Sequence, residues 1–210
     1  MIPQLPANLF EAEDQFFSSL SLFLETNDNS RISINIKLEG LRILPVVIRL
    51  FKKLEENNVQ PILLWPDAGA TALAKRDAPE LSNYIKSFND LLKGVDIQID
   101  GFIFLAISPQ HYDYEEFEAI CTKYSNKIVM FNGKLDDAAV GIGSVARQRR
   151  KNFISKWTNI YWLEPIAKGA ILHSYPEKWR LYRLYSDGYR PFSEFSDKPS
   201  PEAVFEAFLN

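Results

Sequence analysis

Apolar residues recur every three or four positions in some stretches of the first 133 residues, and follow an extended-chain pattern in others. The helical spacing predicts helices over about residues 8–25, 44–54, 68–78, 84–92 and 117–124. The extended pattern predicts strands over about residues 32–36, 62–65, 102–107 and 128–131. The stretch 102–107 is continuously apolar, which is typical of a strand buried on both faces of a parallel sheet.

The pattern changes in the last third of the chain. Short aromatic-rich stretches separated by proline, glycine and aspartate predict antiparallel strands over about residues 161–163, 170–173, 179–184 and 189–195. A last helix is predicted from Pro201 to Phe208, with Ser200 as its N-cap.

These elements predict an α/β fold: a mostly parallel sheet flanked by helices and extended by antiparallel aromatic-rich strands in the C-terminal third. We expect one domain over residues 1–210. Strands and helices alternate in residues 30–133, and residues 134–210 hold a Gly/Arg-rich helix, the antiparallel strands and the final helix.

Composition excludes several protein classes. The chain has 210 residues, of which 46% are hydrophobic and 24% charged, which is globular rather than disordered or fibrous. A single cysteine excludes an internal disulfide, and one cysteine with two histidines argues against a Cys/His zinc site. We assign no metal-binding residue and no cofactor. No apolar stretch approaches the roughly 20 residues of a membrane span. The first 30 residues lack Lys and Arg, which fits neither a secretory signal nor a transit peptide, so we expect a cytosol-like compartment.

Charge is unevenly distributed along the chain. Residues 147–183 contain nine bases and two acids, whereas the whole chain has a net charge of −3. The same segment holds Trp157, Trp162 and Trp179, three of the four tryptophans. A basic and aromatic surface suits an acidic or membrane-proximal partner, which makes Arg149, Lys151 and these tryptophans candidate partner-binding residues. The alternative is that the aromatic rings form core and the bases a solvated face.

Polar or turn residues follow the predicted strands that end at Trp65, Ile107 and Phe131. Ligands collect at the carboxyl ends of strands in open α/β sheets, so Asp67, Gly69 and Asn132 are candidate ligand-binding residues. Small residues after Asp67 leave the N–H groups of a helix start open to an anion. Alternatively, Asp67 only caps that helix, and Asn132-Gly133 only forms a turn.

The segment 141–150 holds the most concentrated motif. Gly141 and Gly143 allow a close backbone approach, and Arg147 and Arg150 share one helical face on which they could bind a phosphate or carboxylate. We reject a dinucleotide fingerprint because the glycines do not directly follow a strand and no βαβ unit follows them. In a competing interpretation the two arginines pair with Asp136, Asp137 or Glu164.

Other catalytic patterns fail, and we assign no catalytic residue. Ser108 and His111 lie close in sequence but lack a nucleophile elbow. Cys121 lies on the apolar stripe of its helix and is expected to be an inert buried thiol. The acidic net charge and the lack of a standard module argue against nucleic-acid binding.

Five blocks of the sequence resemble one family. They are Pro66-Asp67-Ala68-Gly69-Ala70, Asn132-x-x-Leu135, Gly141-Ile142-Gly143-x-x-x-Arg147-x-x-Arg150-x-x-Phe153, Tyr161-x-Leu163-x-Pro165 and Tyr175-Pro176-x-x-Trp179. In this order they resemble the uncharacterised-domain family of cyanobacteria and chloroplasts that includes the Low PSII Accumulation type of photosystem II assembly factor. The resemblance implies a soluble protein on the cytoplasmic or stromal side of the thylakoid, with a role in photosystem biogenesis and no agreed catalytic residues.

Two functional hypotheses follow from the sequence. In the first, the chain is a non-enzymatic assembly factor whose basic, aromatic C-terminal third binds a photosynthetic membrane protein peripherally. In the second, the chain binds or converts a phosphorylated small molecule or nucleotide at the strand ends, with Asp67, Asn132, Gly141, Gly143 and Arg147 around one crevice.

Overall fold

The computed structural model describes residues 4–28, 30–94, 101–135 and 152–209. These residues form two compact units. Unit 1 comprises Met1–Asp28, Ile34–Leu41 and Asn159–Asn210, and unit 2 comprises Asn29–Ser33 and Arg42–Thr158. The sequence predicts a change of pattern after residue 133, whereas the C-terminal segment of unit 1 begins at residue 159 and joins the N-terminal helix in one unit.

Nine strands form a mixed sheet in the order β3-β2-β4-β5-β1-β6-β7-β8-β9, which confirms the predicted fold class. Strand β1 (Arg31–Ile36) contributes to both units. In unit 2 the neighbouring strands are parallel, and in unit 1 they are antiparallel. The other strands are β2 (Gln60–Trp65), β3 (Ile85–Ser87), β4 (Phe102–Ile107), β5 (Ile128–Phe131), β6 (Thr158–Ile166), β7 (Gly169–Ser174), β8 (Trp179–Tyr185) and β9 (Gly188–Phe195).

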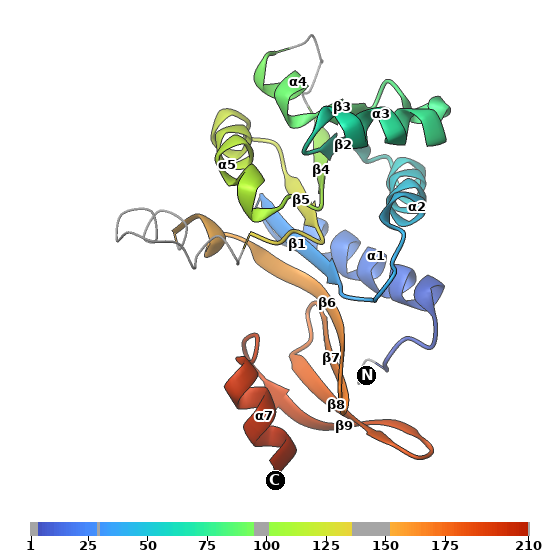
Figure 1. Cartoon of the computed structure of the whole chain (residues 1–210), viewed down its shortest axis with the longest axis vertical. Helices are drawn as coiled ribbons and strands as arrows, with labels where there is room; N and C mark the ends of the chain where they lie inside the picture. The colour runs from blue at the N-terminus through green and yellow to red at the C-terminus, as the bar shows by residue number, and fades with distance from the viewer. Residues whose placement is uncertain (1–3, 29, 95–100, 136–151, 210) are drawn as a thin grey trace. The chain divides into compact units, whose positions relative to one another are not determined.

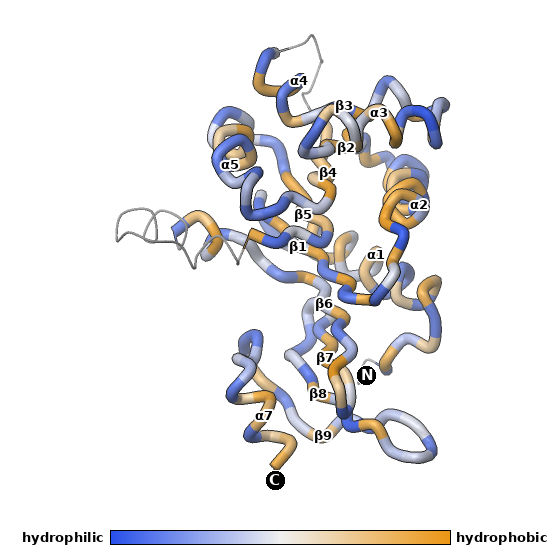
Figure 2. Tube along the Cα trace, viewed as in Figure 1, coloured by the Kyte–Doolittle hydropathy of each residue, from blue (hydrophilic) through white to orange (hydrophobic). Residues whose placement is uncertain are grey.

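Helices cover the parallel strands of unit 2 on both faces (Figure 1). On one face the apolar side chains of α4 (Phe88–Leu92) and α5 (Tyr114–Lys123) pack against alternate residues of β2, β4 and β5. Helices α2 (Ile43–Glu56) and α3 (Ala68–Asp77) lie on the other side of these strands. Because both faces are covered, β4 is almost entirely buried and carries the continuous apolar run that the sequence shows (Figure 2).

One predicted helix is partly wrong. Residues 84–92 form the short strand β3 followed by α4 instead of one helix. Ile85 pairs with Leu63 of β2, and Ser87 then caps α4 with a capping box that includes Asp90. The long-range pairing with β2 therefore overrides the helical spacing of the apolar residues, and the capping box sets where the helix begins.

Unit 1 has a helix on each face of its antiparallel strands. On one face α1 (Leu9–Thr26) packs through ring contacts such as Phe16 with Tyr161. On the other face α7 (Pro201–Leu209) packs against a cluster that includes Trp179 and Leu181. The hydroxyl of Ser200 accepts a hydrogen bond from the N–H of Ala203 at 3.2 Å, which confirms the predicted N-cap.

Candidate functional site

Three neighbouring parallel strands of unit 2 end at one edge of the sheet. Leu64 of β2 lies opposite Ala106 of β4, and Ile107 of β4 lies opposite Phe131 of β5. The chain leaves β2 toward β3 on one side, and leaves β4 toward β5 on the other side. The edge between β2 and β4 is therefore a topological switch point, the place where ligands collect in sheets of this kind.

Asp67 follows β2 and acts as the N-cap of α3. Its Oδ1 accepts a hydrogen bond from the N–H of Ala70 at 2.8 Å, and its carbonyl oxygen accepts one from the Thr71 hydroxyl at 2.7 Å. A Cβ on Gly69 would lie 3.1 Å from the same Oδ1. The capping interpretation of Asp67 is thus confirmed, while the residue itself is exposed at the sheet edge.

Ser108 and Asn132 follow β4 and β5 and share a rare backbone conformation. Their φ angles are +49° and +52°, although neither residue is glycine. The N–H of Ser108 donates to the carbonyl of Phe131 at 2.8 Å, and the N–H of Lys134 donates to the carbonyl of Pro109 at 2.8 Å. The left-handed region costs about 1–2 kcal/mol for a residue with a Cβ, and such strain gathers at functional sites.

Two buried polar atoms at this edge have no hydrogen-bond partner in the part of the chain that the structure describes. They are Oγ of Ser108 and Nε1 of Trp65, at the ends of β4 and β2. A buried donor without an acceptor is rare in folded proteins and calls for an explanation. The sequence places Ser108 at a predicted strand end but does not single it out as a site residue, because a positive φ at a serine leaves no signal in the sequence.

The structure brings together only part of the predicted ligand site. Asp67, Gly69 and Asn132 lie at the described edge, and the ends of β2 and β5 are about 10 Å apart because β4 lies between them. The other candidates, Gly141, Gly143, Arg147, Arg149, Arg150 and Lys151, lie outside the described residues.

The three candidate tryptophans lie in the interior instead of on an open face. Trp157, Trp162 and Trp179 are 8%, 3% and 5% exposed. Trp157 stacks on Phe117 in unit 2, and Trp162 contacts Trp179 in unit 1. Each ring therefore packs in the interior of its own unit. Any partner face would therefore be built from side chains other than these three rings. Glu164, one suggested partner of the arginines, accepts a hydrogen bond from Nε1 of Trp162 at 2.8 Å.

Two bases of the basic segment are also engaged inside unit 1. Arg180 is 7% exposed and pairs with Glu194 and Glu177. The guanidinium of Arg183 lies 4.5 Å from the ring centroid of Phe192 and 5.5 Å from that of Phe208. These two cations support the fold of unit 1. The surface of unit 1 therefore carries less free positive charge than the count of bases in residues 147–183 suggests.

A family model described as "Domain of unknown function (DUF1995)" matches residues 6–206. The chain belongs to this family. The DUF1995 match includes the parallel strands of unit 2 and the antiparallel strands of unit 1. A comparison with curated proteins finds no match.

Side chains that could perform chemistry are sparse in the described part of this DUF1995 domain. Burial raises the pKa of the Cys121 thiol to about 12, so the thiol stays protonated and unreactive near neutral pH, as expected from the sequence. Within the described ranges no group of three or more His, Cys, Asp or Glu side chains could hold a metal ion. No described helix is long and apolar enough to cross a membrane.

His173 is expected to make the DUF1995 domain less stable in acid. Burial lowers its pKa below 6.5, the ring stacks on Trp179 at 4.6 Å, and Nε2 donates to the carbonyl of Asn159 at 2.9 Å. Nδ1 is buried without a hydrogen-bond partner among the described residues, and burial outweighs the backbone contacts with Glu177 and Lys178 that favour a proton on the ring. The unfolded chain takes up this proton near pH 6.5 and the folded chain only at lower pH. The stabilisation is therefore complete above pH 6.5 and is lost as pH falls toward the folded pKa, by at most about 1.4 kcal/mol per pH unit.

Urea unfolding of the wild type and of His173→Gln, at several pH values between 7.5 and 5, measures this contribution. The variant should show a shallower loss of stability below pH 6.5. His111→Gln is the matched control because His111 is exposed, and it should keep the wild-type slope. Equal slopes in all three proteins would show that His173 does not cause the acid sensitivity.

Proposed function

We propose that the protein is a non-catalytic accessory factor that binds a partner protein through exposed apolar side chains in its C-terminal third. One observation carries this proposal. Of the ten large hydrophobic side chains that are exposed in the described part of the chain, five lie within residues 184–209. An exposed apolar surface is costly unless a partner covers it. The five side chains are Leu184, Tyr185, Tyr189, Phe205 and Leu209.

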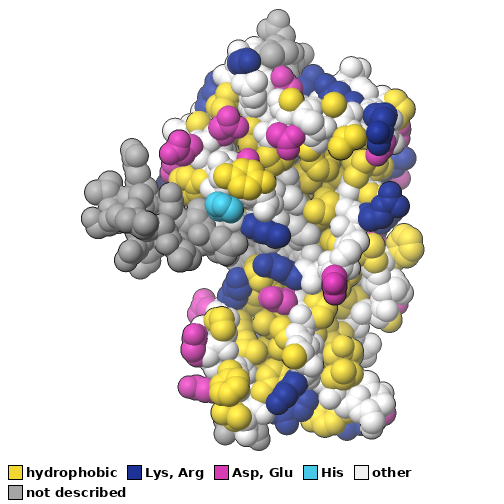
Figure 3. All heavy atoms as spheres, in the orientation of Figure 1, with side chains coloured by type: hydrophobic (Ala, Val, Ile, Leu, Met, Phe, Trp, Pro, Cys, Tyr) yellow, Lys and Arg dark blue, Asp and Glu magenta, His cyan; other side chains and the backbone are white. Residues whose placement is uncertain are grey.

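Helix α7 carries two of them on a second apolar stripe. Val204 and Phe208 pack against the strands of unit 1, whereas Phe205 and Leu209 are 65% and 69% exposed. Phe205 and Leu209 are four residues apart, so their side chains are neighbours on the helix surface. Figure 2 shows apolar and polar residues alternating along α7, and Figure 3 shows hydrophobic side chains over the part of the view that holds β6–β9 and α7.

The β8–β9 hairpin carries the other three. Leu184 of β8 pairs across the ladder with Tyr189 of β9, and Tyr185 follows at the end of β8. The guanidinium of Arg190 lies 5.1 Å from the ring centroid of Tyr185 and also contacts Asp187. Exposed aromatic residues beside an arginine are the side chains most enriched at protein interfaces.

The partner class comes from the resemblance described in the sequence analysis. The proposal is that this chain acts in the assembly of photosynthetic complexes, as a peripheral protein at the cytoplasmic face of a cyanobacterial thylakoid that binds a photosystem II assembly intermediate. Membership of the DUF1995 family supports the resemblance without assigning an activity.

A pull-down from cyanobacterial thylakoid extract tests the proposed function. The full chain should retain identified photosystem II proteins, and Phe205→Ser with Leu209→Ser should reduce their recovery at least tenfold. Leu73→Ser is the matched control, because Leu73 is a 53% exposed leucine on α3, and it should leave recovery unchanged. A second variant pair, Arg147→Glu with Arg150→Glu, tests the contribution of the basic segment. Retention of no photosystem protein by the wild type would overturn the proposal.

A second candidate function, binding of a phosphorylated small molecule or nucleotide, is favoured by Ser108. Its hydroxyl is buried without a described partner, its backbone is in the left-handed region, and it lies at the switch point beside the exposed N-cap of α3. A thermal-shift screen of nucleotides and phosphorylated metabolites should then give saturable stabilisation. Ser108→Ala should abolish that shift, while Ser155→Ala, which removes an exposed hydroxyl elsewhere in unit 2, should not. A flat screen would remove this candidate.

A further inference from the structure

Helix α7 exposes a face that combines apolar and acidic side chains. Its exposed residues are Pro201, Glu202, Phe205, Glu206 and Leu209, and its other residues are half-buried. Residues 202, 205, 206 and 209 repeat at intervals of three and four positions, so they form one stripe along the helix, which we call the α7 face. Figure 3 shows acidic side chains beside hydrophobic ones in the lower left of the view, where Figure 1 shows α7.

The acidic side chains of the α7 face have no base on their own helix, because residues 201–209 contain neither Lys nor Arg. Hydrogen bonds from the backbone N–H of Glu202 and from the Ser200 hydroxyl lower the pKa of the Glu202 carboxyl. Arg183 contacts α7 from its inner side, where the guanidinium lies against Phe208 and Nη2 donates to the carbonyl of Ala207 at 3.4 Å. The outer side of the helix therefore presents negative charge.

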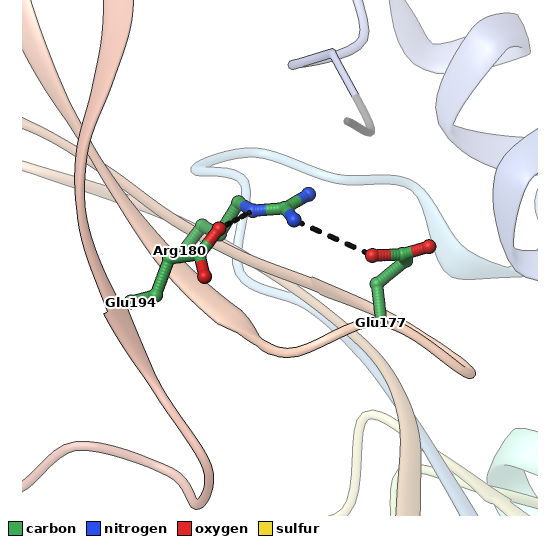
Figure 4. Close-up of polar contacts among 3 residues, drawn as sticks. All are labelled: Glu177, Arg180 and Glu194. Atoms are coloured by element: carbon green, nitrogen blue, oxygen red, sulfur yellow. Dashed lines mark hydrogen bonds and ion pairs between the residues drawn. The ribbon is translucent and has the colours of Figure 1, made fainter. Parts of the chain in front are cut away.

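The negative charge of the α7 face adds to that of unit 1 as a whole. Unit 1 contains 13 acidic and 7 basic residues, although it includes residues 159–183, in which bases are in excess. The buried Arg180 is already balanced by Glu177 and Glu194, at 3.3 and 2.7 Å (Figure 4). Arg190 pairs with Asp187. These pairs leave the excess of acids in place, so the surface of unit 1 is negative.

The charge of the α7 face distinguishes between two surfaces that could cover its apolar side chains. A helix that lies on a membrane carries Lys and Arg beside its apolar residues, because lipid headgroups of the cytoplasmic leaflet are anionic. In α7 the residues beside Phe205 and Leu209 are glutamates. The α7 face would therefore repel an anionic lipid surface, whereas a protein segment with Lys or Arg beside apolar side chains complements both parts of the face.

We propose that the α7 face binds a basic, amphipathic segment of the partner protein. Apolar side chains of that segment cover Phe205 and Leu209, and its Lys or Arg side chains pair with Glu202 and Glu206. The apolar contacts supply most of the affinity, because exposed ion pairs contribute little, and the charges set the choice of partner and the rate of association. This inference rests on the proposed function, since it names the chemistry of the partner that the exposed apolar side chains require.

Fluorescence anisotropy of the full chain with two labelled helical peptides tests the proposal. One amphipathic peptide consists of leucine and lysine, and the other has glutamate in place of each lysine. The leucine–lysine peptide should bind at least tenfold more tightly, and its affinity should fall as ionic strength rises. Phe205→Ser with Leu209→Ser should weaken its binding at least tenfold. Equal affinity of the two peptides for the wild type would overturn the proposal.

Charge variants show whether the peptide binds at the α7 face. Glu202→Gln with Glu206→Gln should weaken binding of the leucine–lysine peptide about fivefold and reduce its salt dependence. Glu206→Gln alone, which leaves the N-terminal cap of α7 intact, should cause part of this loss. Glu25→Gln with Asp28→Asn is the matched control, because it removes two exposed acids of unit 1 near the end of α1, on the other face of the strands. An equal loss in both pairs of variants would mean that the overall charge of unit 1 attracts the peptide, and the proposal would be wrong.

Vesicles of phosphatidylserine and phosphatidylcholine test the membrane as the alternative occupant. The wild type should stay in the supernatant when the vesicles are sedimented. Cosedimentation that Phe205→Ser with Leu209→Ser abolishes would assign the α7 face to a lipid surface and contradict a basic protein partner.

The pull-down from thylakoid extract separates this inference from the proposed function. Glu202→Gln with Glu206→Gln should lower the recovery of photosystem II proteins. Unchanged recovery would contradict the basic partner and leave the proposed function standing. Retention of no photosystem protein by the wild type would overturn the proposed function, and the peptide titrations would still decide the chemistry of the α7 face.

Discussion

Replacing Gly169 by alanine should lower the free energy of unfolding by about 3 kcal/mol, because the site has no room for a methyl group. A Cβ at this position would lie 1.8 Å from the carbonyl oxygen of Tyr182 and 3.2 Å from Cζ of Phe208. The first contact is with backbone, so relief requires β7 and β8 to move apart at a point where Gly169 pairs with Arg183. The same movement would disturb α7, because Phe208 of α7 packs against the apolar cluster of unit 1 that includes Trp179 and Leu181.

Urea denaturation followed by circular dichroism measures the effect. Gly69→Ala is the matched control: among the described residues its added Cβ has one neighbour within 4 Å, a side-chain oxygen of Asp67 at 3.1 Å, and the position lies in the first turn of α3. It should change the free energy of unfolding by less than about 0.5 kcal/mol. A Gly169→Ala variant as stable as the wild type would show that β7 and β8 can move apart at little cost in free energy, which contradicts the prediction.

The parallel strands of unit 2 could be predicted because burial on both faces leaves a direct trace in the sequence. The run from Phe102 to Ile107 is apolar throughout, and it forms β4 as predicted. Strand β3 could not be predicted, since its three residues are specified by pairing with β2 and not by any local pattern. A short strand beside a capped helix keeps the apolar spacing of a helix, and only the partner strand distinguishes the two.

The candidate site was predictable to the extent that it follows from topology. Parallel strands end at one edge, so Asp67 and Asn132 could be placed there from their positions after two strands. The positive φ of Ser108 depends on how the chain turns after β4, and a serine gives no local indication of it. The burial of the three tryptophans could not be predicted from composition. An aromatic and basic segment has the same composition whether its rings face a partner or, as here, the core.

Replacing Arg31 by methionine should destabilise the protein by about 3 kcal/mol, although no catalytic or binding role is assigned to this residue. Nη1 donates to the carbonyls of Ser30 and Asn126, both at 3.0 Å, and Nη2 donates to the carbonyl of Tyr124 at 3.2 Å and to that of Cys121. Cys121 lies in the last turn of α5, where carbonyls have no partner within the helix and a cation is favoured. Methionine fills similar space but removes the guanidinium donor from these carbonyls, of which that of Ser30 still accepts the N–H of Ile128 at 2.7 Å.

Three comparisons separate this structural role from a general effect of losing a charge. Arg76→Met is the matched control, since the side chain of Arg76 is 69% exposed and pairs with the neighbouring Asp77, and it should have almost no effect. Arg31→Lys keeps the charge but cannot donate to several carbonyls from two nitrogen atoms at once, so it should recover only part of the stability.

The thiol of Cys121 reports separately on whether the end of α5 stays folded. Cys121 is buried, and loss of the Arg31 contacts should expose it, so Arg31→Met should speed its alkylation well beyond the rates of the wild type and Arg76→Met. If urea unfolding were unchanged and the thiol stayed protected, the carbonyls around Arg31 would not depend on it for their hydrogen bonds.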